Sequence, residues 1–285
     1  MMPVDETPAP ASTSDTAPTP ASDTGGPTDG RRAGRRALVR APALSLARGE
    51  LTHLERSEVD FELARMQWLD YVAALEAAGF ETVAVEADDH LADSVFVEDA
   101  VVMLGPVAVI TSPGAPSRRG ELEAVSGVIR RLGLTEHRIE LPGTLDGGDV
   151  LKIGRTVYVG RGGRTNAEGI RQFREIANAA GYEVVAVPVS RVLHLKSAVT
   201  ALPDGTVIGH APLVEHPELF DRFLAVPEES GGAVVVLDDE TVLMAASAPR
   251  SAALFDDLGY RVVTVDISEF EKLEGCVTCL SVRIR

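Results

Sequence analysis

The sequence predicts an α/β fold in which one hairpin–helix–strand unit repeats along the chain. Three segments share a pattern of glycine, aromatic residue and short β-branched strand: "AGFETVAVEA" from Ala78, "AGYEVVAVPV" from Ala180 and "LGYRVVTVDI" from Leu258. The predicted hairpin turns follow one another at intervals of about 50 residues, at Gly105-Pro106, Gly154-Arg155 and Pro203–Gly205. A fixed period indicates a repeat or a radially symmetric architecture, not a doubly wound sheet.

The first elements expected are the strand "RALVRAP" and a helix over Glu58–Ala78. Ser57 is in position to cap this helix, and Gly79 to end it. An apolar stripe is expected along one face, formed by Leu63, Met66, Leu69, Val72 and Leu75.

Three strand pairs are expected next, in "AVVMLGPVAVIT", "DVLKIGRTVYVG" and "AVTALPDGTVIG". The last unit is truncated to "CVTCLSVRIR", which is expected to form a hairpin strand beside "RALVRAP" and so complete a ring. Loops of several repeats would then converge on one axis, where residues that are far apart in the sequence can meet.

Residues 1–35 are predicted to be a disordered tail and residues 36–285 a single domain. Residues 1–30 contain no Leu, Ile, Phe, Tyr or Trp, so they cannot bury enough apolar surface to offset the entropy of ordering. "RRAGRR" resembles a twin-arginine signal, but Arg40, Pro42 and Arg48 interrupt the region that follows. A cytoplasmic protein is therefore expected.

The composition limits the classes of partner. The 285 residues carry a formal net charge of −16, which would repel nucleic acid and anionic membrane surfaces and suits a cationic small molecule. No apolar run approaches the roughly 20 residues that span a membrane. Two cysteines do not indicate a disulfide-built secreted domain.

Carboxylates interrupt the predicted strands at two places. Glu98 and Asp99, with Asp93 nearby, lie between the apolar runs "VFV" and "AVVML", where a buried pair needs a cation or hydrogen-bond donors. Asp146 and Asp149 flank two glycines before a strand, and this pattern fits a simple turn as well as a functional site.

His194 and two pairs of arginines are further candidates. A single histidine between Leu193 and Leu195 is typical of a core residue, and a catalytic role is the alternative. The arginine pairs lie in Gly/Ser-rich loops at the same position in the repeat. They either face solvent or face one common axis, where paired guanidinium groups would suit a carboxylate ligand. These pairs are Arg118 and Arg119, and Arg161 and Arg164.

Cys276 and Cys279 favour a single nucleophile. A zinc site lacks a second pair of soft ligands, and a thioredoxin-like motif should open a helix. Here the motif enters "CLSVRI", which predicts a strand with Cys276 and Cys279 on opposite faces. One cysteine with a distant histidine and carboxylate is the arrangement of covalent catalysis.

Six segments in order resemble the dimethylarginine dimethylaminohydrolases, from about Arg36 to Arg285: "DSVFVEDAVV", "TSPGAPSRR", "LDGGDVL", "RTN", "HLKS" and "TCLSV". This family belongs to a guanidino-modifying superfamily with arginine deiminase and the amidinotransferases. The resemblance implies the pentein fold, a five-bladed α/β propeller of pseudo-symmetric ββαβ modules. It also implies a C–N hydrolase that converts asymmetric dimethylarginine or monomethylarginine to citrulline and dimethylamine or methylamine.

The resemblance also implies roles for individual residues. Cys279 would be the nucleophile, His194 the acid and base, and Asp146 its supporting carboxylate. The remaining positions would bind substrate. Its cationic groups would be held by Asp93, Glu98 and Asp99, and its carboxylate by Arg118 and Arg164. Backbone atoms of Leu46 and Leu273 would also contact it, and Glu274, where the family often has Asp, would lie at its α-amino end. No metal ion or organic cofactor is expected.

Other functions stay open. Arginine deiminase and amidinotransferase share the chemistry, and a binding-only pentein or a redox or zinc Cys-x-x-Cys protein would differ in class. The sequence leaves the oligomeric state undecided, with a homodimer as one alternative.

Overall fold

The computed structural model describes residues 34–284 of the chain, so all but two residues of the predicted 1–35 tail lie outside it. Within the described residues the strands form five three-stranded sheets. In the order of each sheet, the strands are β15 (Val282–Ile284), β1 (Arg36–Arg40) and β2 (Glu81–Val85); β3 (Val101–Leu104), β4 (Val107–Ile110) and β5 (Thr135–Arg138); β6 (Val150–Ile153), β7 (Thr156–Arg161) and β8 (Glu183–Pro188); β9 (Val199–Ala201), β10 (Val207–Gly209) and β11 (Phe223–Ala225); and β12 (Val234–Val236), β13 (Thr241–Ala245) and β14 (Arg261–Val265).

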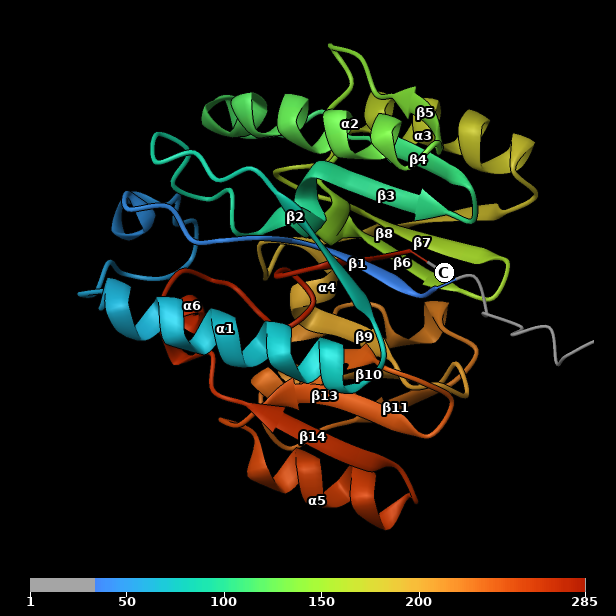
Figure 1. The fold of residues 1–285 in the computed structure, drawn as a ribbon. Helices are drawn as coiled ribbons and strands as arrows, with labels where there is room; N and C mark the ends of the chain where they lie inside the picture. Colours follow the sequence, from blue (N-terminus) through green and yellow to red (C-terminus); the bar gives the residue numbers. More distant parts are fainter. Residues whose placement is uncertain (1–33, 285) are drawn as a thin grey trace, which may run out of the picture. The chain divides into compact units, whose positions relative to one another are not determined.

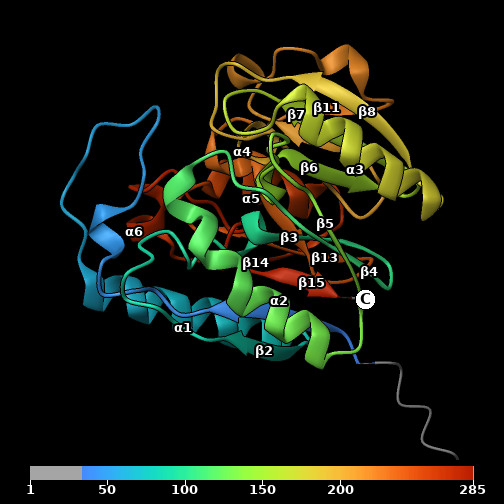
Figure 2. The ribbon, with the colours of Figure 1, turned by 90° about the horizontal axis from the view of Figure 1, so that it is seen from above.

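Every sheet repeats one pattern of pairing. The central strand is antiparallel to the first strand and parallel to the third, as in β3, β4 and β5. The three predicted hairpins are β3–β4, β6–β7 and β9–β10. The predicted α/β propeller of ββαβ modules is thus confirmed, with the sheets succeeding one another around a centre in Figures 1 and 2.

The longer helices connect the second and third strands of a blade and lie on the outside of the strands (Figures 1 and 2). The helices are α1 (Phe61–Ala77), α2 (Leu122–Arg131), α3 (Ala167–Ala179), α4 (Leu195–Ala198), α5 (Pro249–Asp257) and α6 (Ser268–Glu271). The blade of β9 and β10 differs from the expected unit, because two short 3-10 turns, Ala211–Leu213 and Pro217–Leu219, stand where the others have a helix.

Glycines end three of these helices as predicted. Gly79, Gly181 and Gly259 follow α1, α3 and α5 with φ of 82°, 81° and 91°. This left-handed conformation costs glycine little and lets the chain turn directly into the parallel third strand.

The two ends of the described chain close the ring. β15 pairs antiparallel with β1, with Leu38 opposite Val282, and β1 pairs parallel with β2. Leu38, Val282 and Ile284 then pack into one apolar cluster with Val101 and Ile110 of the neighbouring blade. The predicted pairing of the first and last strands is confirmed.

The N-terminal half of helix α1 differs from its prediction. It begins at Phe61, and the Asp60 side chain, not Ser57, caps it by accepting from the Leu63 N–H. The predicted apolar stripe is wrong at Leu63, Met66 and Leu69, which are exposed, and is confirmed at Val72 and Leu75, which pack into the core. The buried positions of the helix are Ala64, Gln67, Tyr71 and Leu75. Tyr71 and Gln67 face inward because they hydrogen-bond to the Val277 carbonyl and to Ser268.

Polar segments enter the centre at one recurring place, immediately before the first strand of a blade. The 3-10 turn Val97–Ala100 precedes β3, Gly147–Asp149 precedes β6, and α4 precedes β9. The turn Cys276–Leu280 leads into β15 in the same way. Pseudo-symmetry therefore brings together residues from four blades. Among the described residues, no helix is both long enough and apolar enough to cross a membrane.

Candidate active site

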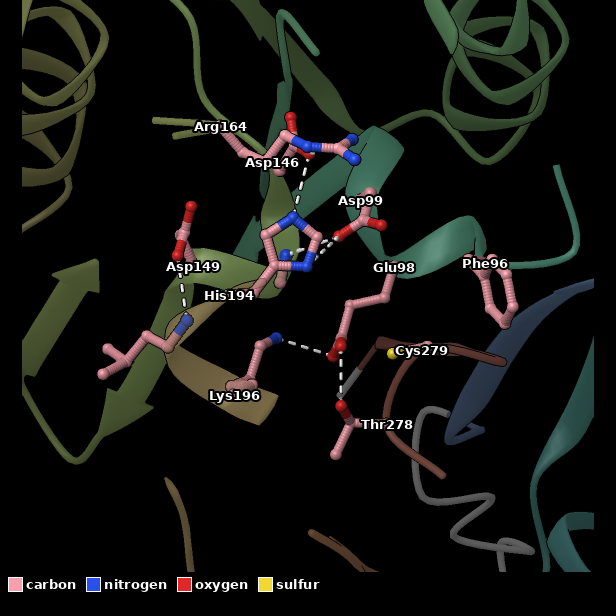
Figure 3. Close-up of polar contacts among 12 residues, drawn as sticks. Phe96, Glu98, Asp99, Asp146, Asp149, Arg164, His194, Lys196, Thr278 and Cys279 are labelled. Carbon is pink, nitrogen blue, oxygen red and sulfur yellow. Dashed lines mark hydrogen bonds and ion pairs between the residues drawn. The ribbon is translucent and has the colours of Figure 1, made fainter. Parts of the chain in front are cut away.

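One small pocket collects most of the residues singled out from the sequence. Asp93, Asp99, Arg118, Arg164, His194, Leu273, Glu274 and Cys279 all line it. Figure 3 shows His194 between Asp146 and Asp99, and Glu98 between Lys196 and Thr278. The convergence of loops expected from the repeat is therefore present.

His194 is held by Asp146. Its Nε2 lies 2.9 Å from Asp146 Oδ2, and both residues are buried. The Asp146 carboxylate also accepts a hydrogen bond from the Gly114 N–H, at 2.8 Å. Burial alone would lower the pKa of His194, but the charge of Asp99 and the hydrogen bond to Asp146 raise it to about 9. At neutral pH the ring is therefore an imidazolium, with Nδ1 toward Asp99.

Asp99 is held ionised by cations and by an N–H group. Arg118 Nη1 lies 2.5 Å from Asp99 Oδ2, and the Gly148 N–H donates to Oδ1 at 2.8 Å. His194 Nδ1 is 3.8 Å from the same Oδ1. Burial would raise the pKa of Asp99, but the charges of His194 and Arg118 lower it to about 2.

Arg118 is buried and hydrogen-bonds to several groups around it. Its guanidinium donates to both Glu121 oxygens as well as to Asp99, and to the carbonyl groups of Asp93 and Phe96. These contacts raise the pKa of Arg118 further above its usual value, although burial opposes the shift. Arg118 therefore lines the pocket and holds the Asp99 carboxylate in place.

The two glycines of "DGGD" allow this close approach. A Cβ on Gly148 would lie 2.6 Å from His194 Nδ1 and 2.7 Å from Asp99 Oδ1. Asp149, just after them, accepts from Thr165 Oγ1 at 2.6 Å and from the Leu195 N–H at 2.9 Å. It thereby fixes the start of α4, directly after His194; burial raises the pKa of Asp149 to about 6.

Glu98 faces a second, larger cavity of about 750 Å³. Its carboxylate pairs with Lys196 Nζ at 2.6 Å and accepts from Thr278 Oγ1 at 2.7 Å (Figure 3). The Glu98 N–H donates to the Cys279 carbonyl at 3.2 Å. Glu98 therefore joins the turn that carries Cys279 to α4.

Cys276 and Cys279 lie on a tight turn and not on a strand. The Cys279 N–H donates to the Cys276 carbonyl at 3.1 Å, and β15 begins only at Val282. The predicted placement on opposite faces is wrong, because the two sulfur atoms are 3.4 Å apart. The hydrogen bond between the thiols, burial, and the charges of Glu98 and Asp99 raise the pKa of Cys279 above its usual value.

A loop of residues 49–56, called the site loop below, borders the pocket through Glu50 and is held by hydrogen bonds to two other lining residues. The Glu50 N–H donates to both Asp93 oxygens, at 3.2 and 3.1 Å. Glu274 Oε1 accepts from three consecutive backbone N–H groups, those of Thr52, His53 and Leu54. The loop therefore connects to both sides of the pocket.

Arg164 and Glu274 are both polar residues that contact the site loop. Arg164 Nη2 donates to Thr52 Oγ1 at 3.1 Å, and its Nη1 lies 3.9 Å from Asp146 Oδ2. Glu274 Oε2 is buried and has no hydrogen-bond partner among the described residues. The pocket has a volume of only about 20 Å³, close to that of one water molecule. In this structure it is therefore too small to hold an amino acid.

Comparison with known proteins identifies the family of this site. A profile described as "N,N dimethylarginine dimethylhydrolase, eukaryotic" matches residues 51–202. The N(G),N(G)-dimethylarginine dimethylaminohydrolase of Streptomyces coelicolor is 62% identical over 88% of this chain and 97% of its own length. The chain belongs to the dimethylarginine dimethylaminohydrolase family. The enzyme of the same name from Pseudomonas aeruginosa is 38% identical over 86% of the chain and 98% of its own length.

Solved structures agree with this family. A dimethylarginine dimethylaminohydrolase with an S-methyl-L-thiocitrulline adduct has a TM-score of 0.83 at 36% identity, covering 88% of this chain and all of its own. A cysteine-to-serine mutant of the Pseudomonas aeruginosa enzyme complexed with citrulline has a TM-score of 0.82. The N-terminal domain of ArgZ, an arginine dihydrolase, shares the fold at 18% identity, with a TM-score of 0.79.

Three of the residues expected from the family resemblance do not line the small pocket. Leu46 is fully buried in the core and does not line it, and Glu98 lies on the side of the larger cavity. Asp146 touches the pocket only through His194 and Arg164. The substrate contacts of Leu46 and Glu98 stay predictions.

Other residues of the site escaped the sequence reasoning. Glu50, Phe96, Leu193 and Gly275 also line the pocket. Lys196, which neutralises Glu98, stands two residues after His194 in "HLKS", and a buried carboxylate that needs a cation was the signal that could have found it. Nothing local in the sequence marks Glu50, because the site loop is positioned by distant partners.

Asp99, Asp146 and His194 also form the group of described residues that could hold a metal ion, with ligand atoms within 4.8 Å of one another. Each already has a partner, since His194 binds Asp146 and Asp99 binds Arg118. A protonated histidine is a poor metal ligand. The expectation that catalysis needs no metal ion stays a prediction.

Proposed function

We propose that this protein hydrolyses N-omega-methylated arginine to citrulline and a methylamine through a covalent intermediate on Cys279. The observation that carries the proposal is that a buried thiol, an ionised carboxylate and a histidine held by Asp146 line one pocket. The family membership supports asymmetric dimethylarginine and monomethylarginine as substrates.

The substrate guanidinium is planar and permanently charged, so it needs carboxylates in a water-poor site. Asp99 has this character, because it stays ionised while buried. Glu98 adds a negative charge beside Cys279, which Lys196 partly neutralises. Asp99 and Glu98 together favour a cation over a neutral ligand, and they hold the plane of the guanidinium next to the sulfur.

The amino-acid end is bound at the site loop. Arg164 offers a guanidinium fork for the substrate carboxylate, and Arg118 is the second candidate although its donors already serve Asp99 and Glu121. Glu274 Oε2 is a buried acceptor that an ammonium group would satisfy, and Asp93 is the neighbouring carboxylate. Leu46 and Leu273 are proposed to contribute backbone atoms.

The nucleophile is activated by the substrate. Without ligand, the raised pKa of Cys279 keeps it as a thiol. A bound cation favours the thiolate, which attacks the central guanidino carbon. The carbon becomes tetrahedral, and the C–N bond to the methylated nitrogen then breaks.

His194 supplies and later removes protons. The imidazolium donates a proton to the leaving amine, which departs as methylamine or dimethylamine and leaves a thiouronium on Cys279. Asp146 holds Nε2, so Nδ1 is the nitrogen available to the substrate side. The neutral ring then takes a proton from water, and the hydroxide releases citrulline and regenerates Cys279.

Citrulline formation tests the proposal. The purified full chain is incubated with asymmetric dimethylarginine, monomethylarginine or arginine, with Cys279→Ser as the matched variant. We expect citrulline from the two methylated substrates and none from Cys279→Ser. Turnover that persists in Cys279→Ser or His194→Ala would refute the mechanism.

Glu274 provides a separate test of substrate binding. We expect Glu274→Ala to raise KM for asymmetric dimethylarginine by about tenfold or more, since both the site loop and the ammonium lose their acceptor. Glu55→Ala, an exposed change on the same loop, is the matched control. Equal KM values in the two variants would remove Glu274 from the binding site.

Arginine deiminase is the second candidate, because the fold is shared with an arginine dihydrolase. Citrulline mainly from arginine would favour it. Transfer of the amidino group to an added amine would indicate an amidinotransferase.

We also propose that residues 36–285 form the catalytic domain and that the preceding tail is dispensable for catalysis. Removal of residues 1–33 is expected to leave kcat and KM unchanged, and a loss of activity would refute this division. The cytoplasmic location and the homodimer alternative are kept as expectations, which fractionation and sedimentation would test.

A further inference from the structure

The two cysteines of the chain share one tight turn. Cys276 Sγ and Cys279 Sγ are 3.4 Å apart, and the hydrogen bond from the Cys279 N–H to the Cys276 carbonyl closes the turn. A β-turn holds its end Cα atoms within about 7 Å, which overlaps the range that a disulfide spans. The sulfur atoms therefore need only a small approach to bond.

The two thiols open onto different spaces. Cys276 lines a cavity of about 320 Å³, together with His53, Leu54 and Glu271. Cys279 lines the small pocket of about 20 Å³. A small oxidant can thus reach Cys276 without passing through the substrate pocket.

The charge states of the pair are unequal. The hydrogen bond from Cys279 lowers the pKa of Cys276 to about 7, although burial and the charge of Glu98 oppose this. A substantial fraction of Cys276 is then thiolate at neutral pH, which is the form that reacts with peroxides. Cys279, the thiol with the raised pKa, lies next to it as the resolving group.

We propose that Cys276 and Cys279 form a reversible disulfide that switches the enzyme off when hydrogen peroxide is present. This inference rests on the proposed function, in which Cys279 is the nucleophile. A disulfide ties up that sulfur, so no thiouronium can form.

The chemistry balances with peroxide as the oxidant. The Cys276 thiolate attacks one peroxide oxygen, the O–O bond breaks, and the departing hydroxide takes a proton to leave as water. Cys279 Sγ then attacks the sulfur of the Cys276 sulfenic acid, the S–O bond breaks, and the hydroxide leaves with the Cys279 proton as a second water. Two electrons pass from the thiol pair to peroxide, and a dithiol reverses the change by exchange.

Oxidation of the full chain tests the inference by mass and by activity. The reduced protein is treated with hydrogen peroxide, the excess is destroyed, and half of the sample is then reduced with dithiothreitol. We expect a mass lower by about 2 Da and a peptide that links Cys276 to Cys279. Activity should fall roughly tenfold or more and return after dithiothreitol.

Cys276→Ser is the matched variant. We expect it to form citrulline before oxidation and to keep its mass and activity after peroxide, because the Cys279 thiol has a raised pKa and lies in the small pocket. Cys276→Ala serves as a second variant. An oxygen gain without a disulfide in the wild type, or an equal loss of activity in the wild type and both variants, would overturn the inference. The mass readout needs no turnover, so it stands apart from any failure of the proposed function.

Discussion

The chemistry of single residues in this site depends on buried carboxylates that have assigned partners. Asp99 binds Arg118, Glu98 binds Lys196, and Asp146 binds His194. An unpaired buried carboxylate would gain a proton and lose its effect on a cationic substrate. The partners therefore keep these groups charged in the absence of ligand.

The pKa of His194 should depend on Asp146. We expect a value near 9 in the wild-type protein. It should fall by about one unit or more in Asp146→Asn, since the hydrogen-bonded charge is lost. A titration of the histidine ring by NMR measures both values, with Asp204→Asn, an exposed change outside the site, as the control. An unchanged value in Asp146→Asn would contradict the assignment.

The same shift has a consequence for stability. A pKa that is raised on folding stabilises the protein fully below the unfolded value of about 6.5. That contribution is lost as pH rises through about 9. The lowered pKa of Asp99 acts in the opposite sense, because its contribution is present above about 3.9 and is lost as pH falls through about 2.

Arg118 should be a stabilising residue as well as a part of the site. We expect Arg118→Met to lower the free energy of unfolding by about 3–5 kcal/mol, because it leaves buried charges on Asp99 and Glu121 without a cation. Urea denaturation measures the change. Arg130→Met, which breaks only an exposed pair with Glu123, should leave the midpoint unchanged. Equal effects of the two substitutions would contradict this account.

At the level of elements, the turn Gly147–Asp149 sets the spacing between His194 and Asp99. Gly148→Ala places a methyl group against both. We expect kcat to fall about 100-fold while the fold persists, because the reacting groups are displaced. In Gly127→Ala, the new methyl group on helix α2 comes no closer than 3.6 Å to the nearest side chain, so kcat should not change. A normal kcat in Gly148→Ala would show that this spacing is not critical.

Elements could be predicted from the sequence where their signals are local. The glycines after α1, α3 and α5 and the three hairpin turns are such signals, and each is where it was expected. The start of α1, in contrast, is not determined by a local signal. Asp60 N donates to Glu269, and Lys272 binds the Glu58 carbonyl, so contacts with distant residues hold the preceding segment extended.

Contacts with residues distant in the sequence also determine the orientation of α1 and the turn that carries the two cysteines. Helix α1 turns Gln67 and Tyr71 inward because its neighbours, α6 and the Cys276–Leu280 turn, present polar groups to it. The cysteine turn is in turn held by the Glu98 N–H, from another blade. Hydrophobic periodicity and strand alternation carry no information about such partners.

At the level of the whole ring of residues 34–284, pseudo-symmetry explains how the site could be largely anticipated. The polar residues that interrupt strands occupy the same position before the first strand of four blades, so a period in the sequence becomes proximity in space. The positions of Leu46 and Glu50 could not be anticipated in this way, because the segment between β1 and α1 that carries both residues falls outside the repeat.

Closure of the ring should be a main source of stability. We expect Leu38→Ala, a fully buried change between β15 and β2, to lower the free energy of unfolding by about 2–5 kcal/mol. Leu44→Ala, at an exposed leucine nearby in the sequence, should have little effect. Denaturant titration compares the two. A small effect of Leu38→Ala would mean that the first and last strands contribute little to the fold.

The central claim is that Cys279 bonds covalently to the guanidino carbon of a methylated arginine. The most direct measurement is the mass of the enzyme after acid quenching during turnover of asymmetric dimethylarginine. The account predicts an added mass equal to the substrate less dimethylamine, located on the peptide that contains Cys279. A protein that forms citrulline while its mass stays unchanged at every quench time, or an adduct on another residue, would contradict it.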